Sequence, residues 1–219
     1  MPQPVRIVLI LAITMSLYPV WPVVPGEPSL LEYTGWMAVE AAFGLCIGLL
    51  VGFISDAMLL FGQLCGLQAG FSFASTIDPN TQADSPVLSA IAQSVAALLF
   101  VTLGLHRYII RIFAESLMSH PPAQLVLQAR WSAIMIHAAG SVFAIGLRLA
   151  LPIVALMAIV DITLALLGRI NAHLQLLQLA MPLKILAALA TISALLMLFP
   201  VVYSEYADRM FRIAYALAR

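Results

Sequence analysis

The sequence has little charge. Only 9% of its 219 residues are charged and 63% are apolar, whereas a soluble domain has roughly 25% charged residues. This composition excludes an ordinary soluble protein and indicates an all-α integral membrane protein. Its net charge is zero, so nucleic acid is not expected as a partner. The two cysteines, Cys46 and Cys65, lie in apolar stretches. They could form one disulfide, but we expect buried free thiols.

Motifs for catalysis, metal binding and nucleotide binding are also lacking. The four histidines show no HExxH or other metal-ligand spacing with a second His, Cys or acidic residue. The sequence contains no GxSxG, P-loop or dinucleotide-binding fingerprint. We therefore expect a protein that is not an enzyme and that has no catalytic residues, metal site or cofactor.

Apolar segments of helix length are abundant instead. About 20 residues span a bilayer, and we expect about five such segments, at residues 5–24, 36–68, 86–105, 131–168 and 174–201. Segment 36–68 is too long for one simple crossing, so it is either a tilted helix or a helix broken near Asp56. Pro152 should kink or break the other overlong segment, 131–168. Residues 203–219 are expected to form a polar tail.

Glycines mark the second apolar segment. They recur every four residues in two runs, which places each run on one helix face. The positions are Gly44, Gly48 and Gly52, then Gly62, Gly66 and Gly70. Glycine on a helix face lets another backbone approach closely. The pattern therefore predicts helix packing, either ordinary contacts between membrane helices or a crowded helical assembly.

A loop without Lys or Arg follows at residues 69–85. Phe71, Phe73 and Ile77 alternate in it with small side chains, and Asp78 and Pro79 then supply a turn. The phenylalanines either pack against the parent protein or a membrane interface, or belong to a loop that occludes an opening.

Five charged residues interrupt the long apolar segments: Glu40 near the start of its segment, and Asp56, Arg148, Asp161 and Lys184 further inside. A central Asp, Lys or Arg costs about 2.5–3.5 kcal/mol on insertion scales, so we expect each to be buried against protein or to face water. If residues 169–173 form the turn of a hairpin, Lys184 lies about one helical turn from the position opposite Asp161. This register predicts an ion pair. Arg148 lies about 20 Å from Asp161 along a straight helix, so it needs another partner, for which we expect another subunit.

Arginines indicate the orientation of the chain. Residues 106–130 contain three arginines, and so does the tail. Two apolar segments separate these regions, so both can lie on the cytoplasmic side. We therefore expect a cytoplasmic C-terminus and a loop 69–85 on the opposite side of the membrane.

The runs GLQAGFSFASTIDPNTQADSPVLSAIAQSVAALLFVTLGLHRYIIRIFAESL, RLALPIVALMAIVDITLALLGRINAHL and AMPLKILAALATI resemble the FliR family of the flagellar type III protein export apparatus, which is homologous to the SctT virulence secretion family. The resemblance extends from about Met37 to Pro200. It implies a core component of the export gate in the bacterial inner membrane and flagellar basal body. Such a component forms, with FliP and FliQ subunits, the channel for unfolded exported flagellar proteins, while FlhB and FlhA act alongside it.

The resemblance also implies how the chain is divided. Residues 1–130 would be a FliP-like helical part, and residues 131–219 a FliQ-like helical hairpin with a cytoplasmic tail. The loop 70–86 would plug the closed pore, with Phe71, Phe73 and Ile77 as its occluding side chains. Family members usually have a further apolar segment before the one that begins here at Val5, so we expect an upstream helix that this chain lacks.

Two other functions fit parts of the same pattern. One is the equivalent component of a virulence type III secretion system, which has the same architecture. The other is an ion-coupled secondary transporter that uses Asp56, Asp161 and Lys184 as a substrate or proton path. Transporters often have internal repeats with paired broken helices. Pro152 and Pro182 are candidates for broken helices, but we find no sequence repeat.

Overall fold

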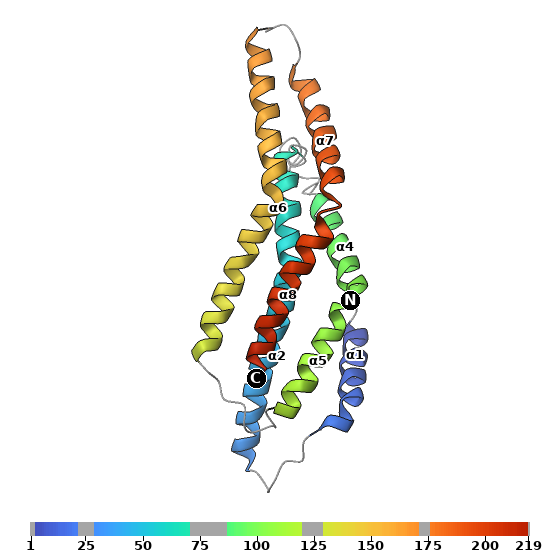
Figure 1. The fold of residues 1–219 in the computed structure, drawn as a ribbon, viewed down its shortest axis with the longest axis vertical. Helices are drawn as coiled ribbons and strands as arrows, with labels where there is room; N and C mark the ends of the chain where they lie inside the picture. The colour runs from blue at the N-terminus through green and yellow to red at the C-terminus, as the bar shows by residue number, and fades with distance from the viewer. Residues whose placement is uncertain (1–2, 22–28, 71–86, 120–128, 171–175, 219) are drawn as a thin grey trace. The chain divides into compact units, whose positions relative to one another are not determined.

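The computed structural model describes residues 3–21, 29–70, 87–119, 129–170 and 176–218, and within these ranges all regular secondary structure is helical (Figure 1). The elements are α1 (Gln3–Ser16), the 3₁₀ helix η1 (Tyr18–Val20), α2 (Leu30–Gln68), α4 (Val87–Thr102), α5 (Leu105–Ser119), α6 (Ala129–Ile170), α7 (Leu176–Leu195) and α8 (Phe199–Leu217). A helix satisfies its backbone hydrogen bonds internally, as a hydrocarbon environment requires. The predicted all-α membrane protein is confirmed.

Two helices, α2 and α6, are each long and apolar enough to cross a membrane. The count rises to four spans if each of two bent helix pairs is taken as one span. These pairs are α4 with α5, bent by 60°, and the part of α7 from Pro182 with α8, bent by 63°. Only 22% of the most apolar stretch of α2, and the same share for α6, is buried within the chain. Most of the surface of both helices is therefore left for lipid or for other chains.

Helix α2 starts earlier than predicted. Ser29 and Glu32 form a capping box, in which the Ser29 N–H donates to Glu32 Oε2 at 2.7 Å and the Glu32 N–H donates to Ser29 Oγ at 3.4 Å. Residues 30–35, which precede the apolar segment predicted at 36–68, are consequently helical. The helix then continues through Asp56 for 39 residues, which is about 58 Å at the usual helical rise. Of the two predictions for this segment, the break near Asp56 is wrong.

Helix α6 is likewise continuous for 42 residues, with Pro152 inside it. The proline removes one backbone N–H donor, but the turns on either side keep their bonds and the helix is not broken there. The turn that we placed at 169–173 starts later, because Arg169 and Ile170 still belong to α6.

The last part of the chain differs most from the prediction. The apolar segment predicted at 174–201 is interrupted, because α7 ends at Leu195 and α8 starts at Phe199. Helix α8 replaces the predicted polar tail. Its apolar face is buried along its whole length, at Tyr203, Tyr206, Ala207, Met210, Phe211, Ala214 and Leu217. These positions recur every three or four residues, as on one face of an amphipathic helix.

The described helices form two compact units. One comprises residues 1–51, 100–137 and 207–219, and the other residues 52–99 and 138–206. In the first unit, the Phe43 ring lies 6.5 Å from Phe113 and 5.8 Å from Trp131, between ring centroids. Each unit contains segments from both the N-terminal and the C-terminal parts of the chain. The predicted division into a FliP-like part, residues 1–130, and a FliQ-like part, residues 131–219, is a different one. It rests on the family resemblance and stays a prediction.

In the second unit, glycine allows two close helix contacts. A Cβ placed on Gly62 of α2 would lie 2.6 Å from Ser89 Cα and 2.8 Å from the Leu88 carbonyl oxygen of α4. A Cβ on Gly146 of α6 would lie 2.8 Å from Leu60 Cδ2 of α2. The Gly62 contact requires glycine, because its neighbours are backbone atoms, whereas a side chain at Gly146 would require the Leu60 side chain to shift. The sequence pattern singled out Gly62 but not Gly146.

The other predicted packing glycines have no such neighbour within the chain. A Cβ at Gly44, Gly48, Gly52 or Gly66 would meet nothing within 4 Å outside its own helix. Gly70 has a φ of 85° and follows the end of α2, and its N–H donates to the Leu67 carbonyl at 3.2 Å. A left-handed residue in this position ends a helix, and glycine adopts it without strain. Gly70 therefore ends α2 instead of extending its packing face.

Replacing Gly62 by alanine should destabilise the protein, because the new Cβ collides with the backbone of α4. Overpacking of this kind costs about 1–3 kcal/mol. Thermal unfolding of the detergent-purified chain, followed by circular dichroism, should show a lower midpoint for Gly62→Ala. Gly48→Ala is the matched control, because nothing lies within 4 Å of its new Cβ. Equal midpoints for the two variants would contradict the close contact between α2 and α4.

Candidate functional site

The predicted plug residues, Phe71, Phe73, Ile77, Asp78 and Pro79, lie outside the residues that the structure describes. Both flanks of the loop are described. Helix α2 ends at Gln68 and α4 begins at Val87. The loop therefore connects two helices, as predicted. Its role stays a prediction.

Helices α6 and α7 bring Asp161 and Lys184 together. The Lys184 ammonium donates to Asp161 Oδ1 in an ion pair within the second unit. The side chain of Lys184 is 19% exposed and that of Asp161 is 42% exposed. The pairing predicted from the register across the turn is thus confirmed. Lys184 covers only part of Asp161, so the carboxylate contacts protein on one side and stays open on the other.

Asp56 and Arg148 are both exposed. Neither has an ion pair or hydrogen bond from its side chain to any described residue. Both side chains lie on outward faces of apolar helices, Asp56 on α2 and Arg148 on α6, so neither is buried against protein within the described part of the chain. An unpaired charge facing hydrocarbon is costly, so each must meet water or a group from outside the described part of this chain.

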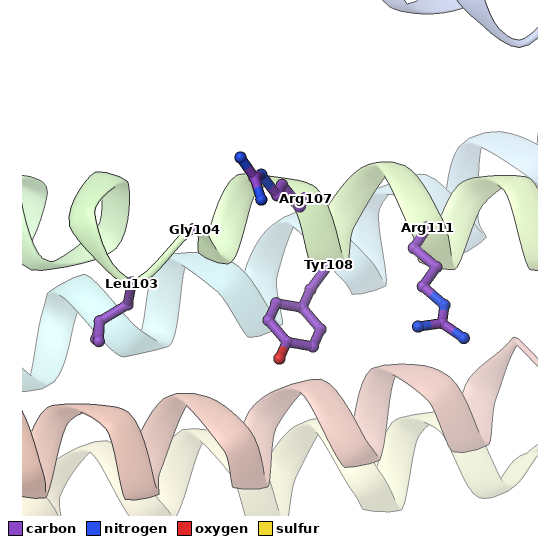
Figure 2. A pocket seen from close by; sticks show the side chains of 5 residues that line it. All are labelled: Leu103, Gly104, Arg107, Tyr108 and Arg111. Atoms are coloured by element: carbon purple, nitrogen blue, oxygen red, sulfur yellow. The ribbon is translucent and has the colours of Figure 1, made fainter.

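A hollow of about 280 Å³ lies at the bend between α4 and α5, lined by Leu103, Gly104, Arg107, Tyr108 and Arg111 (Figure 2). The bend occurs at Gly104, whose φ of 68° is a left-handed conformation that favours glycine. From the sequence, the arginines indicated only the orientation of the chain, and the bend was not predicted. Gly104, directly after a long apolar run, was the signal that could have located it.

The two arginines of the hollow differ in their partners. Arg111 Nε donates to Glu115 Oε1 at 2.8 Å, one helical turn further on. Arg107 has no ion pair with any residue in the described ranges. In Figure 2 its side chain leans back toward Gly104, whereas that of Arg111 leans the other way along α5.

The cysteines are free thiols. Cys65 is buried in α2 and Cys46 is half-buried, so the predicted free thiols are present, although only one of them is fully buried. Within the described ranges, no three His, Cys, Asp or Glu side chains are grouped so that they could hold a metal ion.

The long apolar helices define an integral membrane protein made of α-helices. Residues 1–210 match the family described as "Bacterial export proteins, family 1", and the chain belongs to this family. The family resemblance that we drew from the sequence is thereby confirmed.

The chain is similar to proteins named flagellar biosynthetic protein FliR. It is 29% identical over 196 residues to that of Escherichia coli (strain K12), covering 89% of this chain and 75% of the relative. It is 28% identical over 172 residues to that of Buchnera aphidicola subsp. Acyrthosiphon pisum (strain APS), covering 76% and 66%. The protein of Pectobacterium carotovorum subsp. carotovorum is also 28% identical, over 177 residues, covering 80% and 66%. The chain thus spans between 66% and 75% of the length of these three relatives.

Lys184→Met should impair assembly of the protein with its partner subunits. The change leaves Asp161 as an unpaired carboxylate between two apolar helices, and a central Asp costs about 2.5–3.5 kcal/mol on insertion scales, less here because the group is partly exposed. The double variant with Asp161→Leu removes both charges and should partly restore assembly. Co-purification yield of the partner subunits measures the effect. Full assembly of the single variant would show that the ion pair does not clamp the hairpin.

Proposed function

We propose that this chain is a non-enzymatic core component of a bacterial export gate that serves flagellar biosynthesis. The match of residues 1–210 to the bacterial export family is the observation that carries the proposal, and the names of the relatives supply its flagellar side. The apolar helices α2 and α6 support a place in the inner membrane. In our proposal the C-terminus lies in the cytoplasm, and residues 106–130 and 203–219, which contain three arginines each, lie on that side.

The gate that we propose is a multi-subunit assembly. In it, this chain and FliP and FliQ subunits form the channel, FlhA and FlhB act alongside, and unfolded flagellar proteins pass through. Two features of the described chain support assembly with other membrane subunits. Most of the apolar surface of α2 and α6 is left uncovered, and Asp56 and Arg148 stand exposed on these helices. Groups from neighbouring subunits could pair with both charges.

The loop 70–86 is the part of the chain that we propose as the plug of the closed channel. Its support comes from the sequence, in which Phe71, Phe73 and Ile77 alternate with small residues and Lys and Arg are absent. A ring or plug of apolar side chains can close a channel to ions because water is unstable in such a constriction.

Co-expression of the tagged chain with the FliP and FliQ subunits of its own genome should yield one large particle. Native mass spectrometry of the detergent-solubilised sample should show one copy of this chain with several partner subunits. Arg148→Gln should lower the yield, because the group on a neighbouring subunit that we propose pairs with Arg148 would lose its positive partner. Arg169→Gln, at the end of the same helix, is the control and should not. Recovery of the tagged chain as a monomer or homodimer would argue against an export-gate component.

Removal of residues 71–77 should make the assembled gate leak small ions. The three apolar side chains that we place in the constriction would be gone, and water and ions could enter. Ion flux from proteoliposomes that contain the assembled gate measures the leak. Substitution of Phe71, Phe73 and Ile77 by serine should have the same effect without shortening the loop, whereas Ser72→Ala should not. Unchanged flux in correctly assembled variants would rule out the plug.

A further inference from the structure

We propose that the hollow at the bend between α4 and α5 binds the phosphate group of an anionic phospholipid, through Arg107 and Arg111. The proposal goes beyond export, because it gives the chain a lipid-binding site of its own. It rests on the place of the hollow in the sequence, on its charge and on its shape.

The hollow lies where the chain changes from apolar to basic. Helix α4 has no charged residue in its 16 positions. After it, the chain bends by 60° at Gly104 and enters α5, the amphipathic helix that carries both arginines. A change of this kind within a few residues is typical of the boundary between the hydrocarbon layer and the lipid headgroups. Basic residues that directly follow an apolar membrane segment on its cytoplasmic side attract anionic headgroups.

The charges of the hollow favour an anion. Arg107 and Arg111 contribute two positive charges and Glu115 one negative charge, so one positive charge remains uncompensated. Arg107 is not paired with any residue of the described ranges, and Arg111 uses Nε toward Glu115, which leaves its terminal amino groups for a ligand. A guanidinium group offers its donors in a planar fork that matches the oxygens of a phosphate. In Figure 2 the two side chains diverge along α5, with Arg107 on one side of the helix and Tyr108 and Arg111 on the other.

The shape and the apolar residues of the hollow favour a lipid. Its volume of about 280 Å³ has room for a headgroup whose acyl chains remain outside. Tyr108 and Leu103 line it and are 41% and 39% exposed. A tyrosine ring of this kind, apolar with a polar tip, is enriched at the membrane interface. Val101, 63% exposed near the end of α4, offers apolar surface for the acyl chains.

The test compares lipid binding to variants that lose the same charge at different places. The chain, with any partner subunits that remain bound, is extracted in mild detergent, and dioleoylphosphatidylglycerol or dioleoylphosphatidylcholine is titrated in and followed by native mass spectrometry. Arg107→Gln with Arg111→Gln should weaken phosphatidylglycerol binding by at least about tenfold, since each basic residue near an anionic surface contributes about fivefold. The control, Arg209→Gln with Arg212→Gln, removes two exposed arginines from α8 and should change binding less than about twofold.

The other outcomes overturn the proposal. Equal losses in the two double variants would mean a general charge effect. Equal affinity for the zwitterionic lipid, or displacement of phosphatidylglycerol by an equal concentration of inorganic phosphate, would show that no anionic lipid is selected. Loss of a bound protein subunit without loss of lipid would assign the arginines to an acidic protein surface. A photoactivatable phosphatidylglycerol tests the unmutated protein, so a folding defect cannot obscure the result. Its label should map to residues 103–111, and a label elsewhere would place the lipid at another site.

Discussion

A hydrocarbon layer offers no hydrogen-bond partners to a polypeptide, and the structure of this chain depends on that constraint. Helices satisfy the backbone internally, and the described part of the chain is accordingly helical. The same constraint applies to charge. Asp161 and Lys184 satisfy it together across the α6–α7 hairpin, whereas Asp56 and Arg148 stand exposed on apolar helices. Pairing within the chain therefore accounts for only part of the charge that its apolar helices carry.

Shape decides how membrane helices pack, because lipid is as apolar as the side chains and burial gives little driving force. The second unit shows this at two glycines. The α4 backbone occupies the space that a Cβ on Gly62 would need, and the Leu60 side chain occupies the space that a Cβ on Gly146 would need. Aromatic contacts complete the packing, for example between Phe61 and Phe199, whose ring centroids are 5.0 Å apart. These contacts hold α2 against α4, α6 and α8.

The sequence allowed the apolar segments, the all-α fold and the Asp161–Lys184 pair to be predicted, because hydropathy and register across one turn are local properties. Other features were readable but missed. Ser29 and Glu32 have the spacing of a capping box, and the apolar residues of α8 recur at helical spacing. The break between α7 and α8 lies in an unbroken apolar run, so hydropathy could not locate it. The exposure of Asp56 and Arg148 could not be predicted either, since sequence places a charge on a helix without showing what surrounds it.

The glycines of α2 separate contacts within the chain from contacts beyond it. In the interior of a helix, each glycine costs about 1 kcal/mol relative to alanine. At Gly62 the close approach of α4 offsets this cost, whereas Gly70 lies beyond the end of α2, where its left-handed conformation favours glycine. Gly44, Gly48 and Gly52 have no such compensation within the chain, since a side chain there would meet nothing. They lie on the same helix as the exposed Asp56. A neighbouring helix in the proposed assembly would explain both features, because it could approach the glycine face closely and supply a partner for the carboxylate.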